Sequence, residues 1–347
     1  MFLRQTPGGG VSSEEGAQNP AAAASATDDE SSLNNNKPAF LVKIRDTANV
    51  AYRFSRPHTI KGTILASLVG VIRALRENPG SLSMSLVPRA LTGLVALLCG
   101  NAYIVGINQI YDVGIDKINK PFLPIASDEL SILKAWMWVL GCLVVGGSIV
   151  KTQFSPLIFQ LYGLGGFLGT IYSVPPFSLK RFPVAAGGII AIVRGFLLNF
   201  GVYYAVREAL HVPFQWNPVV LFISTFMTIF ASIIAVTKDL PDVKGDVEYN
   251  IETFASKFGV PVIAKAATAV LCTAYLGAML LAVVSSRRGW AFKLLPMVGG
   301  HAALMVSLLL GHRKLVASGY TQDAIKHFYY KSVWNVFYLE YILYPFI

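Results

Sequence analysis

Long apolar stretches recur along the chain and are separated by short polar segments. Several reach about 20 residues, the helix length needed to cross about 30 Å of hydrocarbon. The period-two alternation of a transmembrane barrel is absent, and a backbone in lipid must satisfy its own hydrogen bonds, so we expect helices. The pattern predicts nine spans: 59–75, 86–111, 130–150, 155–173, 183–207, 217–238, 261–284, 291–311 and 327–347.

Residues 1–37 differ in composition from the rest of the chain. They are rich in Gly, Ala, Ser, Asn and acidic residues, and such a segment cannot bury enough apolar surface to fold. An intact transit peptide is instead Arg-rich and poor in acids, so any targeting signal is expected to have been removed or to be degenerate. We therefore expect a disordered tail over 1–37 and a single transmembrane domain over 38–347.

Composition supports a membrane protein. Of the 347 residues, 54% are hydrophobic and 14% are charged, whereas an average soluble domain is about a quarter charged. The net charge of +10 is compatible with nucleic-acid binding, but no basic patch is interleaved with aromatic residues, so we expect no nucleic-acid partner. Cys99, Cys142 and Cys272 lie in apolar segments without CxxC spacing and are interpreted as core thiols. The expected fold is an all-α multi-pass membrane protein, with nine helices around a central cavity in a lipid bilayer.

The basic residues are distributed unequally between the two sides of the membrane. If the chain enters span one from a first side, the loops after spans two, four, six and eight return to that side. Arg194 lies within a span, and 20 of the 29 Lys and Arg residues lie on or near the first side. The positive-inside rule makes this first side the cytosolic or equivalent face. Eight basic residues lie at the opposite side: Arg73, Arg76, Arg89, Lys151, Arg207, Arg287, Arg288 and Lys293.

Two acidic clusters follow even-numbered spans and so lie on the same side. Residues three or four apart share one face of a helix, so each cluster forms a stripe of oxygen-bearing side chains. Like charges at this spacing repel each other, so we expect a cation between the stripes. The first stripe is Asn108, Asp112 and Asp116, and the second is Asp239, Asp242 and Asp246.

The side chains of the two stripes suit one metal in particular. Carboxylate and amide oxygens are hard ligands typical of Mg²⁺, which shares its coordination between a few carboxylates and substrate phosphates. No His or Cys lies beside the stripes, which argues against zinc. One acidic stripe alone is more often a solvated helix end, but two matched stripes on one side favour a site for a metal-bound diphosphate. Pro241 in the second stripe predicts that the helix ends or kinks there.

A basic loop follows span four on the same side as the stripes. Its sequence is YSVPPFSLKRF over residues 172–182, and the paired prolines stop the helix. Tyr172, Ser173, Lys180 and Arg181 are candidates for holding diphosphate oxygens. Ordinary positive loop charge is the alternative interpretation.

Further candidates come from spans one and five. Arg56 and Arg53 stand at the entrance to span one, on the side of the stripes. Arg194 lies deep within span five and Asn199 follows it, and an intramembrane charge usually faces a cavity or a partner. We expect Arg56 to bind diphosphate, and Arg194, Asn199 and Arg53 to line a substrate pocket. A buried structural ion pair is the alternative for Arg194.

At these residues the chain resembles the UbiA superfamily of intramembrane aromatic prenyltransferases. The resemblance covers residues 50–347 and rests on N-x-x-x-D-x-x-x-D at 108–116, D-x-x-D-x-x-x-D at 239–246 and the YSxPPxxLK loop. Gln109 departs from the Asp of many members, but an amide is common there in the plant homogentisate branch. Four further stretches of sequence resemble those of homogentisate solanesyltransferases more than those of phytyltransferases. They are NKPFLPIAS at 119–127, IVRGFLLNFGVYYA at 192–205, TKDLPDVKGD at 237–246 and VWNVFYLEYILYPFI at 333–347.

The resemblance implies a reaction and a location. Such enzymes transfer a polyprenyl group from its diphosphate to an aromatic acceptor, and solanesyltransferases join solanesyl diphosphate to homogentisate with loss of CO₂, toward plastoquinone. Mg²⁺ held by both stripes is the implied cofactor, and a chloroplast membrane such as the inner envelope is the implied location. Phe200, Tyr203 and Tyr204 are candidates for lining a dry chamber that stabilises an allylic cation.

Other function classes fit the sequence less well. A homogentisate phytyltransferase of tocopherol biosynthesis is the alternative within the family. An ion-coupled transporter also uses intramembrane acids, but those lie near the midplane in broken helices, whereas these stripes lie at span ends. A soluble prenyl synthase would lack the apolar spans, and a CDP-alcohol phosphotransferase would need a D-G-x-x-A-R run, which is missing.

Overall fold

A computed structural model describes residues 39–81, 84, 86–249, 251–287 and 292–347. The expected tail over 1–37 lies outside these residues. The described chain is helical and contains no strand, which confirms the expected class. It divides into two compact units at Asn49: the described part of the first unit belongs to helix α2 (Ala39–Phe54), and Val50–Ile347 forms the second unit.

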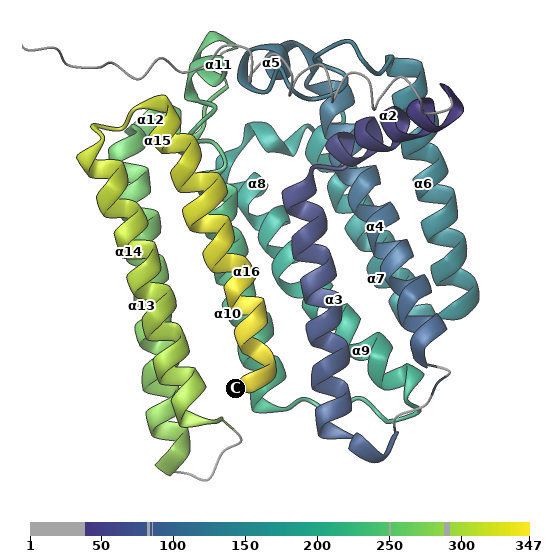
Figure 1. Cartoon of the computed structure of the whole chain (residues 1–347), viewed down its shortest axis with the longest axis vertical. Coiled ribbons are helices and arrows are strands. Elements are labelled where there is room, and N and C mark those ends of the chain that lie inside the picture. The colour runs from purple at the N-terminus through teal and green to yellow at the C-terminus, as the bar shows by residue number, and fades with distance from the viewer. Residues whose placement is uncertain (1–38, 82–83, 85, 250, 288–291) are drawn as a thin grey trace, which may run out of the picture. The chain divides into compact units, whose positions relative to one another are not determined.

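The second unit is built from long helices that lie side by side (Figure 1). They are α3 (Pro57–Glu77), α4 (Leu86–Tyr111), α6 (Ile132–Gln153), α7 (Pro156–Ser173), α10 (Pro218–Thr237), α13 (Val260–Arg287) and α14 (His301–Ala317). Two further long helices are composite: α8 (Pro183–Ile190), η3 (Ala191–Leu197) and α9 (Leu198–Ala209) form one, and α15 (Gln322–His327), η5 (Phe328–Val333), α16 (Trp334–Leu343) and η6 (Tyr344–Phe346) form the other. Short helices connect them: η1 (Pro79–Ser81), α5 (Val113–Asn119), η2 (Leu179–Arg181), α11 (Val243–Glu248), α12 (Phe254–Phe258) and η4 (Pro296–Gly300).

Local sequence explains where several helices begin. Ser131 is the N-cap of α6 and accepts a hydrogen bond from the backbone N–H of Lys134 at 3.4 Å. Asn217 caps α10 in the same way through the N–H of Val220 at 2.9 Å, and proline follows it in the first turn. Such side chains satisfy N–H groups that a helix leaves free, while proline needs no donor there.

The nine expected spans all coincide with helices, but their number as membrane spans is not confirmed. Within the described residues, six helices are long and apolar enough to cross a membrane. The six match the expected spans one, two, three, five, six and seven. The segments 155–173, 291–311 and 327–347 are helical but are not among the six that meet the criteria of length and apolar composition.

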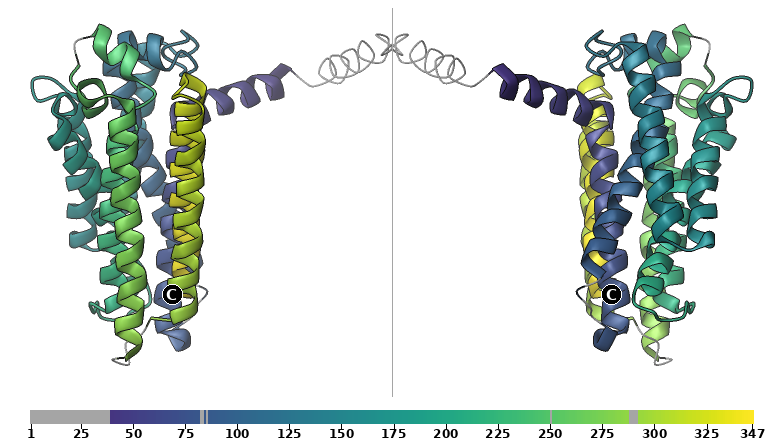
Figure 2. Two further views of the ribbon diagram at one scale, coloured as in Figure 1. Left: turned by 90° about the vertical axis from the view of Figure 1, so that its left-hand side faces the viewer. Right: turned by 90° about the vertical axis from the view of Figure 1, so that its right-hand side faces the viewer.

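The core of the second unit lies among α10, α13, α14 and α16, where the buried residues are almost all apolar. Smaller clusters join α4 with α6, and α3 with α9. By contrast, the outer side of α6 leaves large apolar side chains open, with Leu133 72% and Val144 66% exposed. Exposed apolar surface of this extent suits contact with lipid. The side views show that the axes of the long helices of this unit are roughly aligned with one another (Figure 2).

The short helices α5 and α11, which follow the two acidic stripes, meet at one end of the bundle (Figure 1). The backbone N–H of Gly245 donates to Asn119 Oδ1 at 3.1 Å. A Cβ atom at position 245 would lie only 2.7 Å from Asn119 Cγ, so glycine is required for this close approach. The contact brings together two loops more than a hundred residues apart in sequence.

Candidate active site

The first stripe lies where α4 gives way to α5. Asp112 separates the two helices, so the stripe is not on one unbroken helix as its spacing suggested. The face is nevertheless preserved: the N–H of Asp116 donates to Asp112 O at 2.8 Å, and Asn108 Nδ2 donates to Asp112 Oδ2 at 2.8 Å. The side chains of Asn108, Asp112 and Asp116 therefore remain one above another.

The second stripe has the same design at the end of α10. That helix ends at Thr237, and α11 begins after Asp242, which confirms the break expected near Pro241. Backbone N–H groups of Asp242 and Asp246 donate to Asp239 O and Asp242 O, both at 3.1 Å. Asp242 and Asp246 are buried.

Three lysines lie among the carboxylates. Lys120 Nζ pairs with Asp242 and lies 3.7 Å from Asp116 Oδ1, so it bridges the two stripes. Lys180 pairs with Asp112, as its place among the candidates suggested, and Lys238 Nζ lies 2.5 Å from Asp239 Oδ1. Sequence reasoning did not identify Lys120 and Lys238 as site residues. Their positions directly after Asn119 and before Asp239 were the available signal.

Burial and the interactions between charged groups shift the pKa values of several site residues. Burial, reinforced by the nearby Asp239 and Asp242, raises the pKa of Asp246 to about 7. Burial also raises the pKa of Asp116, although Lys120 and Arg56 oppose the shift. For Lys120, burial lowers the pKa, but attraction to Asp242 and Asp116 outweighs it and the pKa is raised overall. The acids therefore still favour additional positive charge.

Arg56 joins the first stripe from the start of α3. Its guanidinium donates to Asn108 Oδ1 at 3.0 Å and lies 3.9 Å from Asp116 Oδ2. Its φ of 53° is in the left-handed region, which is unfavourable for a residue with a Cβ atom and is found at some active sites. Arg56 is thus held beside the carboxylates by the backbone as well as by its side chain.

Only some residues of the basic loop, 172–182, lie at the site. Ser173 is buried, with its Oγ 3.5 Å from Asn108 Nδ2, and Tyr172 lines a cavity beneath the stripes. Lys180 reaches Asp112, whereas Arg181 is exposed. In the described chain, Arg181 forms no ion pair with either stripe.

The carboxylate and amide oxygens of the two stripes are of the kind that binds a divalent metal, and lysine amines lie among them. No group of three His, Cys, Asp or Glu side chains is arranged to hold a metal ion within the described residues. Lys120 and Lys180 pair with carboxylates of the two stripes. Asp116 Oδ2 is buried and has no hydrogen-bond partner among these residues. A hard cation would satisfy this orphaned oxygen and reduce the repulsion around Asp246.

A cavity of about 580 Å³ begins directly beneath the charged cluster. Arg56, Asn108 and Lys238 line it at this end, and Phe154 and Val206 line it near the other end of the bundle. Most of the lining between these ends is apolar side chain or glycine. The arrangement places a polar, cation-binding end above a long apolar chamber.

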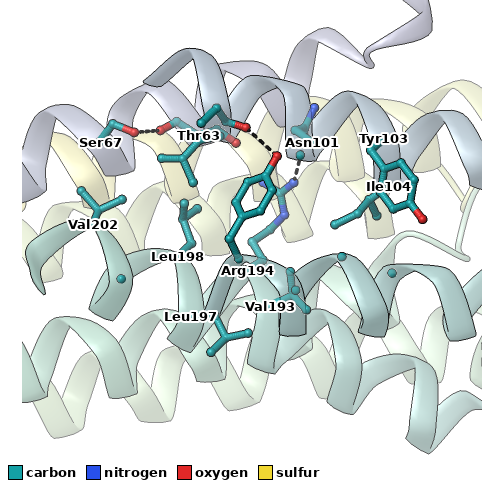
Figure 3. Close-up of a pocket in the computed structure, with 18 of the residues that line it drawn as sticks. Thr63, Ser67, Asn101, Tyr103, Ile104, Val193, Arg194, Leu197, Leu198 and Val202 are labelled. Carbon is teal, nitrogen blue, oxygen red and sulfur yellow. Dashed lines mark hydrogen bonds between the residues drawn. The ribbon is translucent and has the colours of Figure 1, made fainter. Parts of the chain in front are cut away.

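Of the residues expected in the substrate pocket, Arg194 lines the cavity (Figure 3). Asn199 does not: its Nδ2 donates to Gly195 O of its own helix at 2.7 Å. Arg53 also lies elsewhere, paired with Glu129 and donating to Phe122 O at 3.3 Å. Helical spacing explains the difference for Asn199, because the cavity face of this helix follows steps of three and four residues from Arg194: Leu197, Leu198, Gly201 and Ala205.

The three aromatic residues expected in the chamber lie outside it, which corrects that interpretation. Phe200 stacks on Phe196, and Tyr203 donates its hydroxyl to Glu77. Tyr204 packs against Phe214. All three are off the cavity face of their helix. The aromatic lining comes from other helices, and its members are Tyr103, Phe154, Tyr162, Phe167, Tyr172, Tyr329 and Trp334.

The sequence is similar to those of plant enzymes. It is 54% identical over 311 residues to "Probable homogentisate phytyltransferase 2, chloroplastic" of Oryza sativa subsp. japonica, covering 89% of this chain and 81% of that protein. It is 52% identical over 307 residues to "Homogentisate solanesyltransferase, chloroplastic" of Arabidopsis thaliana, covering 88% of this chain and 78% of that protein.

Solved structures share the fold at low sequence identity. A UbiA homolog from Archaeoglobus fulgidus bound to GPP and Mg²⁺ is 16% identical, with a TM-score of 0.61 over 86% of this chain and 98% of that one. A digeranylgeranylglyceryl phosphate synthase is 17% identical, with a TM-score of 0.57 over 87% and 99% of the two chains. The profile of the UbiA prenyltransferase family matches residues 63–333. With relatives above 50% identity and a family match over most of its length, this chain belongs to the UbiA prenyltransferase family.

Proposed function

We propose that this protein transfers a polyprenyl group from its diphosphate to homogentisate, with loss of CO₂, in a chloroplast membrane. The observation that carries the proposal is the position of the two acidic stripes directly above a long apolar cavity. A polyprenyl diphosphate has the same division, with an anionic head and an apolar tail. The names of the relatives supply the acceptor: both proteins above 50% identity are named as homogentisate prenyltransferases.

Mg²⁺ is the proposed cofactor, held by Asn108, Asp112 and Asp116 on one side and by Asp239, Asp242 and Asp246 on the other. When bound, it neutralises the leaving diphosphate and so makes the allylic carbon electrophilic. Lys180 and Arg56 contact side chains of the first stripe. They are proposed to bind the diphosphate, together with Tyr172, Ser173 and Arg181. In the described structure, Lys180 pairs with Asp112, so its amine lies beside the residues that would hold the metal and could donate to a diphosphate bound there.

The cavity is proposed to protect the reaction from water. The bond between the allylic carbon and the diphosphate oxygen breaks, with its electron pair leaving on the diphosphate. A ring carbon of homogentisate forms the new bond and loses its proton, and the carboxyl group leaves as CO₂ while a proton replaces it. Tyr172, Tyr329 and Trp334 line the chamber, and aromatic rings there would favour a positively charged allylic group over water.

We further propose solanesyl diphosphate as the donor, which places the enzyme in plastoquinone biosynthesis, with all nine expected helices spanning the inner envelope membrane. The four sequence stretches that resemble solanesyltransferases favour this donor, and the cavity, which runs between both ends of the bundle, offers space for part of a long apolar chain. Phytyl diphosphate is the alternative, because one relative above 50% identity is named as a phytyltransferase.

The direct test is a transfer assay in membranes. Radiolabelled homogentisate is incubated with Mg²⁺ and a series of prenyl diphosphates, and the product is extracted into organic solvent. We expect label transfer with solanesyl diphosphate as the best donor. Absence of transfer with every donor would reject the enzymatic proposal, while a preference for phytyl diphosphate would reject only the choice of donor.

The metal cradle is tested by substitution. Asp242→Asn keeps the shape of the side chain but removes its charge, and turnover should fall at least about 100-fold because charge stabilisation of the leaving group is lost. Asp128→Asn is the control, since Asp128 is exposed and pairs with the exposed Lys117. Full activity of Asp242→Asn, with normal amounts of protein in the membrane, would show that the stripes do not hold the metal.

A further inference from the structure

Arg194 is an intramembrane cation that has no anionic partner among the described residues. It lies within the span Pro183–Ala209, on the π-helical turn η3, and lines the cavity (Figure 3). Its ionisable neighbours include the neutral phenols of Tyr329, Tyr338 and Tyr341, and no Asp or Glu of the described chain pairs with it. Charged side chains in membrane helices nearly always pair with one another or face a functional cavity, and π-helical turns are common at functional sites. The missing partner is therefore expected to be an anion that enters the cavity.

The surroundings hold the guanidinium in a fixed place. Its Nη2 lies 3.5 Å from Asn101 Oδ1, and its Cζ lies 5.7 Å from the ring centre of Trp334. Gly62 makes room on the third side, because a Cβ atom there would lie 3.3 Å from Nη1. Nη1 itself is buried and has no hydrogen-bond partner among the described residues. Arg194 thus retains unused donor capacity in a position that three other helices define.

The depth of Arg194 determines which ligand it suits. Asn101 precedes Asn108 by seven residues on α4, so it lies two turns, or about 10 Å, deeper on nearly the same face. Asn108 belongs to the proposed diphosphate cradle. A ligand that reaches from Arg194 toward the allylic carbon must therefore be about the length of a substituted ring, with an anionic group at its deep end.

We propose that Arg194, positioned by Asn101, binds the carboxylate of the aromatic acceptor and so directs the ring toward the allylic carbon. The inference rests on the proposed function and adds the acceptor subsite to it. A guanidinium presents parallel N–H donors that match a carboxylate. The diphosphate is a poorer candidate ligand, since Arg194 lies two turns below the acids and Lys180, where a metal-bound diphosphate would be held.

The first experiment compares two acceptors in the purified protein. Homogentisate carries the carboxylate, and methylhydroquinone has the same ring without it. Arg194→Gln should lower the preference for homogentisate, measured as the ratio of kcat/KM values, by about 10- to 100-fold, because a charged hydrogen-bonded contact is lost. Arg194→Lys should retain part of the preference, and the KM for the prenyl diphosphate should remain unchanged in both variants.

Arg89→Gln is the matched control, because Arg89 lines the same cavity near its other end and pairs with Glu208. It should leave the preference between the two acceptors at its wild-type value. An unchanged preference in Arg194→Gln would overturn the inference. So would a rise in the KM for the prenyl diphosphate without a change for homogentisate, which would assign Arg194 to the donor.

A second measurement needs no turnover. Equilibrium dialysis of the wild-type protein in nanodiscs compares radiolabelled homogentisate with its methyl ester, in the absence of a donor. Binding of the acid at least about tenfold tighter than the ester is expected, with this advantage lost in Arg194→Gln. Equal binding would overturn the inference. Failure of the proposed function appears differently, as tight binding of the acid without prenylation of either acceptor.

Discussion

At the scale of single residues, Lys120 is the side chain that most changes the view of the site. It bridges Asp116 and Asp242 and so joins two stripes that the sequence separates by more than 120 residues. Its amine occupies the place where a cation is needed, and its attraction to these acids raises its own pKa despite burial. Lys120 therefore supplies positive charge between the two stripes.

Lys120→Met should destabilise the protein in EDTA by about 1–3 kcal/mol. The loss is smaller than for a fully buried ion pair, because the Lys120 side chain is 18% exposed. The physical reason is that Asp116 and Asp242 then repel each other without a counter-charge. Thermal unfolding in EDTA measures the loss. Lys117→Met is the control and should change stability by less than about 0.5 kcal/mol, since its pair with Asp128 is exposed. Equal effects of the two substitutions would show that the bridge is not important for stability.

Metal binding gives the complementary prediction. Mg²⁺ with inorganic diphosphate at about 100 times its dissociation constant should stabilise the wild-type protein by about 2.7 kcal/mol, seen as a higher Tm. Asp116→Asn should abolish most of this shift, because Asp116 provides an oxygen that lacks a partner in the described structure. An unchanged shift in this variant would exclude Asp116 as a ligand.

At the scale of elements, the site depends on the approach of α5 to α11. Gly245 allows its N–H to reach Asn119 Oδ1, and this contact aligns the two helices that follow the stripes. Both long helices break next to the acids, after Tyr111 and after Thr237, and Asp242 pairs across with Lys120 in the loop of the first stripe.

Gly245→Ala should therefore separate α5 from α11 and lower both stability and activity. Overpacking of this kind costs about 1–3 kcal/mol, and a misplaced carboxylate should lower turnover at least about tenfold. Gly141→Ala is the control, because nothing lies within 4 Å of a Cβ atom built at that helical position. Unfolding midpoints and transfer rates of both variants provide the test; wild-type activity of Gly245→Ala would contradict the role of this contact.

At the scale of the whole second unit, the cavity is shared by helices that are distant in sequence. Gly166 of α7 lines it, and a Cβ atom built there has no neighbour within 4 Å. A large side chain at this position would extend into the space proposed for the prenyl tail without breaking the backbone.

Gly166→Phe should shift donor preference toward shorter chains. Relative to geranyl diphosphate, kcat/KM for solanesyl diphosphate should fall about tenfold or more, since displacing a few methylenes from a packed site costs about 1–3 kcal/mol. Gly147→Phe is the control: Gly147 does not line the cavity and also has free space at its Cβ position. A parallel loss for both donors in Gly166→Phe would indicate damage to the fold instead of a shortened chamber.

The sequence by itself determined which segments are helical and that the two acidic stripes lie on one side, because hydrophobic length and three- or four-residue spacing are local properties of a chain. It also predicted that Arg194 faces a cavity or a partner, since an isolated charge in an apolar span needs one, and Arg194 lines the cavity. Only the tertiary structure decided that Lys120 bridges the stripes, that Asn199 and Phe200 face away from the cavity, and that Asn101 contacts Arg194. These facts depend on which helices become neighbours and how each is rotated, and no local pattern specifies those long-range contacts.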